Sequence, residues 1–145
     1  MKELEKELEN LYKVQKELVD NSLRWTEGNG FYRLEASVLV PNGVKLKLKG
    51  TYNPKRNTFS FILLHKRKHK VRQFDLKSHW NPDNTHVSGP HKHYWSAEYN
   101  DTIAYEVDDV NPTDVDEAII NFLDECNISY EGIKYIPIGF VKLQT

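Results

Sequence analysis

Strict alternation of apolar and polar side chains around a tight turn is the feature that most constrains the fold. The segment from Phe31 to Val40 places every second residue on one face of a strand: Tyr32, Leu34, Ala36, Val38 and Val40. Asn42-Gly43, after Pro41, suits a hairpin turn, because both residues tolerate positive φ values. The next strand repeats the pattern, with Val44, Leu46 and Leu48 facing inward and Lys45, Lys47 and Lys49 facing outward. This stretch therefore predicts an antiparallel hairpin with one buried face.

More strands follow in the same style. The run from Thr58 to His65 is so apolar that both of its faces are expected to be covered, which predicts a central strand. A basic turn, Lys66-Arg67-Lys68, leads into a strand from Val71 to Leu76. Segments Lys92 to Tyr99 and Thr102 to Val107 then predict a further hairpin across Asn100-Asp101. Together these segments predict a meander of about six strands.

Two segments have helical periodicity. Residues from Lys2 to about Asn21 place leucines seven apart at positions 4, 11 and 18. The second helix is expected to be capped by Asn111, with Pro112 in its first turn, and its apolar stripe comprises Val115, Ala118, Ile119, Phe122 and Leu123. Residues 127–131 are expected to end it, and Lys134 to Leu143 predicts an edge strand or extended tail.

The expected fold class is α+β: an antiparallel meander sheet of about six strands flanked by an N-terminal helix and a C-terminal amphipathic helix. At 145 residues the chain has the usual length of one domain. We expect a single domain, 1–145, with residues 1–21 as a helical extension and 31–128 as the core. The chain has one cysteine, Cys126, and its first residues contain no apolar run. No segment is apolar over the length needed to span a membrane. These features predict a cytoplasmic protein that does not bind membranes.

Charge is segregated along the chain although the net charge is only −1. The stretch from Lys45 to Lys77 carries a net charge of +10, and the stretch from Tyr94 to Gly132 carries −11. Such a basic block is the electrostatic footprint of phosphate-backbone binding. The expected nucleic-acid-binding residues are Lys45, Lys47, Lys49, Lys66, Arg67, Lys68 and Arg72. The alternative for the lysine ladder is a solvated sheet face whose lysines prevent aggregation.

Four of the six histidines lie between Ser78 and His93. His91 and His93 are two residues apart at the start of a strand and therefore share a face, while His79 and His86 lie on the preceding loop. One interpretation is a site for zinc or another divalent metal, with Asp83 as a further ligand, although no recognised ligand spacing is present. No other cofactor is expected.

A second interpretation is acid-base catalysis on a phosphodiester. One histidine would take a proton from a 2′-hydroxyl and another would protonate the leaving oxygen. The candidates are His91 and His93, assisted by His86 and His79, with Lys92 stabilising negative charge. The third interpretation is structural, in which the histidines hold a long loop by hydrogen bonds. The sequence leaves these three interpretations open.

The acidic side of the second helix has two explanations of its own. Asp116, Glu117 and Asp124 coat the face opposite the apolar stripe. Such carboxylates usually serve solubility. A row of them can also imitate a nucleic-acid backbone and bind the basic groove of a partner protein.

The pattern Phe74-Asp75, Asp83-Asn84, His86 and Gly89-Pro90-His91-Lys92-His93, followed by strands and an amphipathic helix, resembles the TumE-like proteins of prokaryotic toxin–antitoxin operons. It is also similar to related uncharacterised proteins of bacteria and their mobile elements. The resemblance covers residues 58–128 and implies an α+β domain with a histidine-rich strand end and a toxin role. Val87 and Lys92 stand where adjacent histidine pairs are expected.

From these features we expect a nucleic-acid-directed protein of the TumE-like type that acts as a histidine-dependent ribonuclease, with nucleic acid or an antitoxin as partner. The rival expectation is a non-enzymatic inhibitor, encoded by a phage or mobile element, that binds a bacterial defence nuclease through its acidic helix. The sequence does not indicate an oligomeric state.

Overall fold

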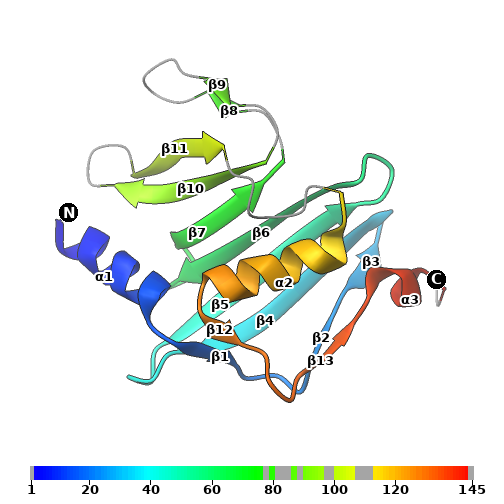
Figure 1. Ribbon diagram of the computed structural model, residues 1–145, viewed down its shortest axis with the longest axis horizontal. Helices are drawn as coiled ribbons and strands as arrows, with labels where there is room; N and C mark the ends of the chain where they lie inside the picture. The colour runs from blue at the N-terminus through cyan, green and yellow to red at the C-terminus, as the bar shows by residue number, and fades with distance from the viewer. Residues whose placement is uncertain are drawn as a thin grey trace.

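A computed structural model describes residues 2–76, 79–80, 86–87, 90–96, 100–106 and 113–143 of the chain, and side chains within 3–76, 90–92 and 113–142. The fold is α+β: a curled, mostly antiparallel sheet with helix α2 lying across one face (Figure 1). We call the face towards α2 the inner face and the opposite one the outer face.

The predicted meander is confirmed. The six strands are β4 (Phe31–Leu39), β5 (Lys45–Asn53), β6 (Thr58–His65), β7 (His69–Asp75), β10 (His91–Ser96) and β11 (Asn100–Glu106). They lie in the order β11-β10-β7-β6-β5-β4, each antiparallel to its neighbour. β6 is central, as its apolar sequence predicts. The turn expected at Asn100-Asp101 is displaced, since Asn100 already pairs with Ser96.

Alternation fixes which residues face α2. Leu34, Leu48, Phe61 and Phe74 lie in neighbouring strands and are almost fully buried. They meet the apolar stripe of α2 (Val115–Glu125), where the Phe61 and Phe122 ring centroids are 5.7 Å apart. The predicted stripe residues of α2 are all buried: Val115, Ala118, Ile119, Phe122 and Leu123. Burial of this face holds the helix on the sheet.

Helix α2 begins later than predicted. Asp114, not Asn111, is its N-cap, and its carboxylate accepts hydrogen bonds from the backbone N–H groups of Asp116 and Glu117. Asn111 and Pro112 lie outside the described residues. Aspartate serves as an N-cap as well as asparagine does, and the sequence prediction considered only Asn111.

The N-terminal helix is shorter than predicted. Helix α1 (Lys2–Lys13) ends before the short strand β1 (Lys16–Leu18), because the Lys16 ammonium group binds the carbonyl oxygens of Leu11, Tyr12 and Val14 at 2.6–2.8 Å. This side chain closes the last turn of α1, and Leu18 reaches the core from a strand. Strands β2 (Ser22–Arg24) and β3 (Thr26–Gly28) follow, with β3 paired to β4.

The C-terminal segment returns to the N-terminal strands. β12 (Ile128–Ser129) runs parallel to β1, and β13 (Lys134–Ile136) runs parallel to β2. The prediction of one edge strand or extended tail over residues 134–143 is thus partly wrong. The first residues form strand β13, but the last ones form helix α3 (Ile138–Leu143). A separate pair joins β8 (His79–Trp80) to β9 (His86–Val87). No helix in the described part of the chain is long and apolar enough to cross a membrane.

Candidate functional site

A buried cluster of charges joins α1, α2 and the inner face of the sheet. Glu125, in the last turn of α2, forms ion pairs with Lys92 of β10 and with Arg72 of β7, whose Nε lies 2.8 Å from Oε2. Tyr12 of α1 donates its hydroxyl proton to the same carboxylate oxygen at 3.0 Å. The Arg72 guanidinium carbon lies 3.8 Å from the Tyr12 ring centroid, a cation–π geometry. We call these four residues the Glu125 cluster.

The Glu125 cluster has the chemistry of a structural clamp. Arg72 is 5% exposed and Lys92 is 2% exposed, so neither group can reach a large ligand. Buried charges are tolerated when opposite charges lie beside them, and here two cations share the Glu125 carboxylate. The sequence analysis predicted that Arg72 binds nucleic acid and that Lys92 stabilises negative charge beside the catalytic histidines. The structure instead places both on the inner face, against Glu125.

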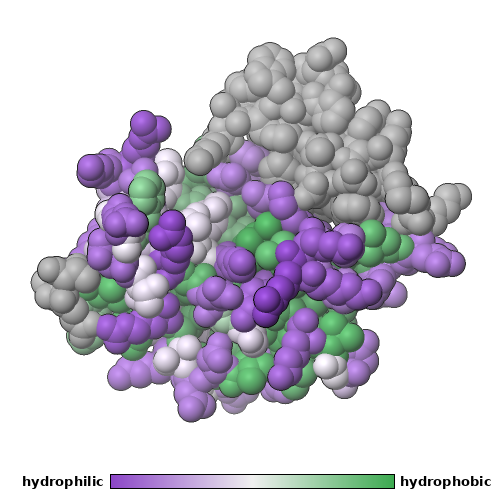
Figure 2. All heavy atoms as spheres, turned by 180° about the vertical axis from the view of Figure 1, so that it is seen from behind, coloured by the Kyte–Doolittle hydropathy of each residue, from purple (hydrophilic) through white to green (hydrophobic). Residues whose placement is uncertain are grey.

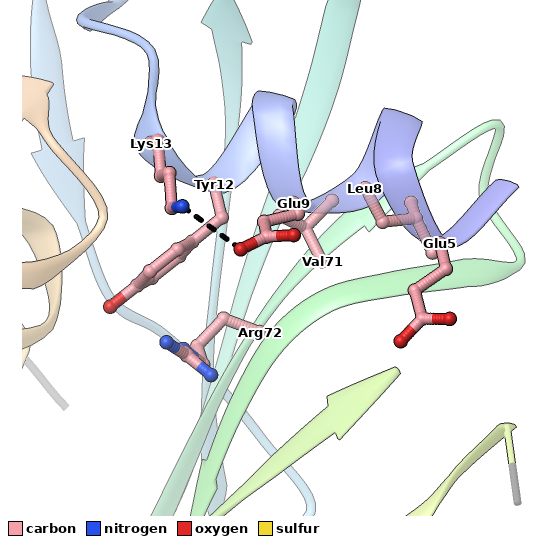
Figure 3. A pocket seen from close by; sticks show the side chains of 7 residues that line it. All are labelled: Glu5, Leu8, Glu9, Tyr12, Lys13, Val71 and Arg72. Carbon is pink, nitrogen blue, oxygen red and sulfur yellow. Dashed lines mark ion pairs between the residues drawn. The ribbon is translucent and has the colours of Figure 1, made fainter. Parts of the chain in front are cut away.

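A pocket of about 240 Å³ opens beside this cluster, between α1 and β7 (Figure 3). Its wall on the α1 side carries Glu5, Glu9 and Lys13, and Arg72 lies below the Tyr12 ring. Lys13 binds Glu9 at 2.9 Å, and this hydrogen bond lowers the pKa of the Glu9 carboxyl. Because the charges of this pocket are mixed, and Glu9, Lys13 and Arg72 form ion pairs within the chain, we assign it no ligand.

Cys126 and Lys16 lie buried next to the cluster. Burial raises the pKa of the Cys126 thiol to about 12, so it stays protonated near neutral pH and is a poor nucleophile. Burial also lowers the pKa of Lys16 to about 8, but this side chain is committed to closing helix α1. Neither group has the exposure that a reactive residue needs.

The histidine-rich stretch is described only in part. His91 pairs with Asp75 on the outer face, is 1% exposed, and projects to the face opposite Lys92. The backbone of His93 lies two residues further along β10, and those of His79 and His86 form the β8–β9 pair. The side chains of His93, His79 and His86 lie outside the described part. The structure thus separates Lys92 from His91 and leaves the predicted acid-base set untested.

Of the predicted metal ligands, only His91 has a described side chain, and those of His79, Asp83, His86 and His93 lie outside the described residues. Among the described side chains, no three histidine, cysteine, aspartate or glutamate residues gather as metal ligands. The two remaining histidines flank the β6–β7 turn: His65 is buried with Nε2 3.0 Å from Glu7 Oε1, which ties β6 to α1. The pKa of His69 is lowered, first by burial and then by Lys68.

The outer face gathers basic residues at one corner. Lys47 pairs with Leu64, and Leu64 pairs with Lys70, so three neighbouring strands bring β5 lysines beside the β6–β7 turn. We call this group the basic corner; it comprises Lys45, Lys47, Lys66, Arg67, Lys68 and Lys70. Lys47 lies 3.4 Å from Glu35, while Lys45 and the three turn residues are exposed. Lys49 continues the ladder along β5. Hydrophilic side chains dominate the described part of this side of the molecule (Figure 2).

The acidic residues of α2 divide into two groups. Asp116 is used within the fold: its Oδ1 accepts hydrogen bonds from the Tyr135 hydroxyl and the Ile138 N–H. Burial and then this hydrogen bond raise the pKa of Tyr135. Glu117 and Asp124 are exposed, and Asp124 accepts a hydrogen bond from Tyr130 at 2.9 Å. Of the three residues predicted to bind a partner, Asp116 thus fastens the C-terminal segment to α2.

Residues 4–128 match the family of unknown function DUF6978. The chain belongs to this family. The DUF6978 match runs from α1 to β12 and therefore includes the Glu125 cluster and the basic corner, whereas β13 and α3 lie beyond it. No curated protein and no solved structure matches the chain. The resemblance to TumE-like toxins stays a prediction.

Sequence patterns missed the Glu125 cluster. Glu125 lies three residues after the buried Phe122, at the edge of the apolar stripe of α2, which is the available signal for a carboxylate turned towards the sheet. Its two cations come from strands 33 and 53 residues earlier in the chain. No local spacing connects them.

Proposed function

We propose that the protein binds single-stranded nucleic acid across its outer face, with RNA as the preferred ligand. The basic corner would contact the phosphates. Lysine and arginine side chains on a rigid sheet follow a phosphate backbone and release its counterions. The corner is supported from behind by the buried inner face, so its strands keep a fixed spacing. This arrangement supports binding as the primary activity.

The observation that carries this proposal is the conformation of the β6–β7 turn. Lys66 has φ 55° and Arg67 has φ 62°, both in the left-handed region. Turns of this kind normally use asparagine and glycine, because other side chains crowd the backbone there. Two adjacent basic residues therefore occupy positions that their own conformational preference disfavours. Strain of this kind gathers at functional sites, which supports a role for these two cations.

The burial of His91 argues that this residue does not cleave the bound RNA. A general base must come within hydrogen-bonding distance of a 2′-hydroxyl, and the His91 side chain is 1% exposed. We therefore propose that the outer face binds RNA, and that the ribonuclease activity expected from the TumE resemblance does not depend on His91.

Fluorescence anisotropy with labelled RNA tests the proposal. Lys45→Ala with Lys66→Ala removes two cations from the basic corner; Lys13→Ala with Lys134→Ala removes two exposed cations outside it and is the matched control. With single-stranded RNA, each lost phosphate contact lowers the slope of log K against log salt by about 0.7, so the corner variant should lose about 1.4. The control should bind as the wild type does.

Equal binding by the two double variants would contradict the basic corner as the site. If the wild type binds no RNA, the proposal itself is wrong. In that case the exposed carboxylates Glu117 and Asp124 become the candidate surface for a protein partner, since the last turn of α2 contains no basic residue. Charge reversal at these two residues then tests that alternative.

A further inference from the structure

Phe31 and Arg33 lie on the outer face, at the end of the sheet opposite the basic corner. They are two residues apart on β4, so their side chains leave the same face of the strand. The Phe31 side chain is 45% exposed. Val19 and Phe140, the other large apolar side chains exposed in the described part of the chain, lie outside the meander. Phe31 therefore places an exposed ring on a face that is otherwise polar.

The Arg33 guanidinium group lies beside this ring, on the side of strand β3. Gly28 of β3 pairs directly with Phe31, and a Cβ added at this glycine would lie 3.9 Å from a guanidinium nitrogen of Arg33. Arg33 is exposed, and no carboxylate of the described residues forms an ion pair with it. Its positive charge is therefore available to a ligand that contacts the ring.

On the side of strand β5, the surface beside the ring is hollowed. A pocket of about 250 Å³ lies there, lined by Phe31 and by residues of the next strands, among them Thr51 and Ser60. This volume is below the roughly 300–1,000 Å³ of drug-sized ligands and suits one planar group. Thr51 and Ser60 hydrogen-bond to each other, and Asp75 at the far wall accepts the Leu76 N–H. The pocket therefore gives space beside the ring, and we assign it no base-specific contact.

A row of cations connects Phe31 to the basic corner. Arg33 pairs with Thr51, which lies two residues beyond Lys49 on the outer face of β5. The segment from Lys45 to Thr51 spans roughly 20 Å at the usual rise of a strand. The one carboxylate between Arg33 and Lys47 on this face of β4, that of Glu35, lies 3.4 Å from the Lys47 ammonium group. The cations of the row are Lys45, Lys47, Lys49 and Arg33.

Exposed aromatic rings on a sheet are the platforms on which single-stranded RNA stacks its bases, and nearby cations hold its phosphates. We propose that Phe31 stacks one base of the bound RNA and that Arg33 binds the phosphate next to that base. The inference rests on the proposed RNA binding and adds a second anchor, at the other end of the outer face. Because every base has a face that can stack on a ring, this anchor does not select a sequence.

The test uses two labelled decamers with the same phosphates, a uridine RNA and an abasic RNA that lacks all bases. The wild type should bind the uridine decamer at least about fivefold more tightly. Phe31→Ala should weaken binding of the uridine decamer by at least about fivefold, with an unchanged salt slope, and leave binding of the abasic decamer unchanged. Phe31→Tyr keeps a ring and should bind both as the wild type does. Phe140→Ala removes an exposed ring from α3 and is the matched control. Arg33→Ala should lower the slope of log K against log salt by about 0.7 for both decamers.

Equal affinity of the wild type for the two decamers overturns the stacking and leaves the RNA-binding proposal standing. This comparison needs no variant, so it decides even if a variant does not fold. If Phe31→Ala weakens both decamers by the same factor, or neither, the ring does not stack a base. An unchanged salt slope for Arg33→Ala overturns the phosphate contact. Failure of the wild type to bind either decamer removes both proposals.

Discussion

Replacing Glu125 by glutamine keeps the shape of the side chain and removes the negative charge that Arg72 and Lys92 share. Both cations remain within the sheet, 5% and 2% exposed. Breaking a buried ion pair by neutralising one partner costs about 3–5 kcal/mol, because the remaining charge stays desolvated. The Glu125 side chain is 13% exposed, which places the expected cost near the lower end, about 3 kcal/mol.

A loss of this size is large for a small domain, whose whole free energy of unfolding is about 5–15 kcal/mol. Urea unfolding followed by circular dichroism and by tryptophan fluorescence measures it, since Trp25 is fully buried. With a denaturant slope of about 2 kcal/mol per molar urea, the midpoint should fall by about 1.5 M.

The matched control is Glu9→Gln, which removes an exposed carboxylate paired with Lys13 on the surface of α1. Its midpoint should equal that of the wild type, because exposed ion pairs contribute little. A Glu125→Gln midpoint within experimental error of this control would refute the argument that the cluster clamps α1 and α2 to the sheet.

Three further experiments test separate parts of the structure. Gly50→Ala should cost about 1–3 kcal/mol in a urea titration, because an added Cβ would lie 3.0 Å from the Trp25 ring; an unchanged midpoint would show that the ring moves freely. Asp114→Ala should cost about 1 kcal/mol through loss of the α2 cap, while Asp114→Asn should not. The buried Cys126 thiol, with its pKa of about 12, should react with a disulfide reagent at pH 8 only at the rate of unfolding; immediate reaction in the native protein would contradict its burial.

The double substitution Lys66→Asn with Arg67→Gly separates the effect of the β6–β7 turn on stability from its effect on RNA binding. Both quantities are measured on the same variant. Both new residues prefer the left-handed conformation that the turn requires, so the melting temperature should rise. Loss of two cations should weaken RNA binding at the same time. If stability and affinity both fall, the argument from backbone conformation is wrong.

The meander could be predicted from the sequence because its information is local. Alternation from Phe31 to Val40, the Asn42-Gly43 turn and the stripe of α2 each specify one element within about ten residues. The same patterns predicted that the lysines of β5 face away from the core. The confirmed strand order brings the basic turn beside them.

The N-terminal strands, the end of α1 and the Glu125 cluster depend on contacts between residues far apart in the sequence, which no local pattern predicts. β1 and β12 have three and two residues, too few for alternation to distinguish them from loops. Lys16 ends helix α1 by a side-chain cap that interrupts an otherwise continuous leucine spacing. Charge alone assigned Arg72 to nucleic-acid binding and Lys92 to the catalytic set. Their burial instead depends on Glu125, a residue of another element.

The pairing of β1 with β12 and of β2 with β13 has a consequence for how the chain is made. Lys16 pairs with Ile128, and Ser22 pairs with Lys134, each 112 positions later. At about 5–20 residues per second, the ribosome releases the second partner roughly ten seconds after the first. The basic corner, built from residues 45–70, can form during that interval, whereas β12 and β13 cannot pair with β1 and β2 until residues 128–136 have been released. In a nascent chain stalled before residue 128, proteases should therefore cleave within β2 faster than within β5 and β6.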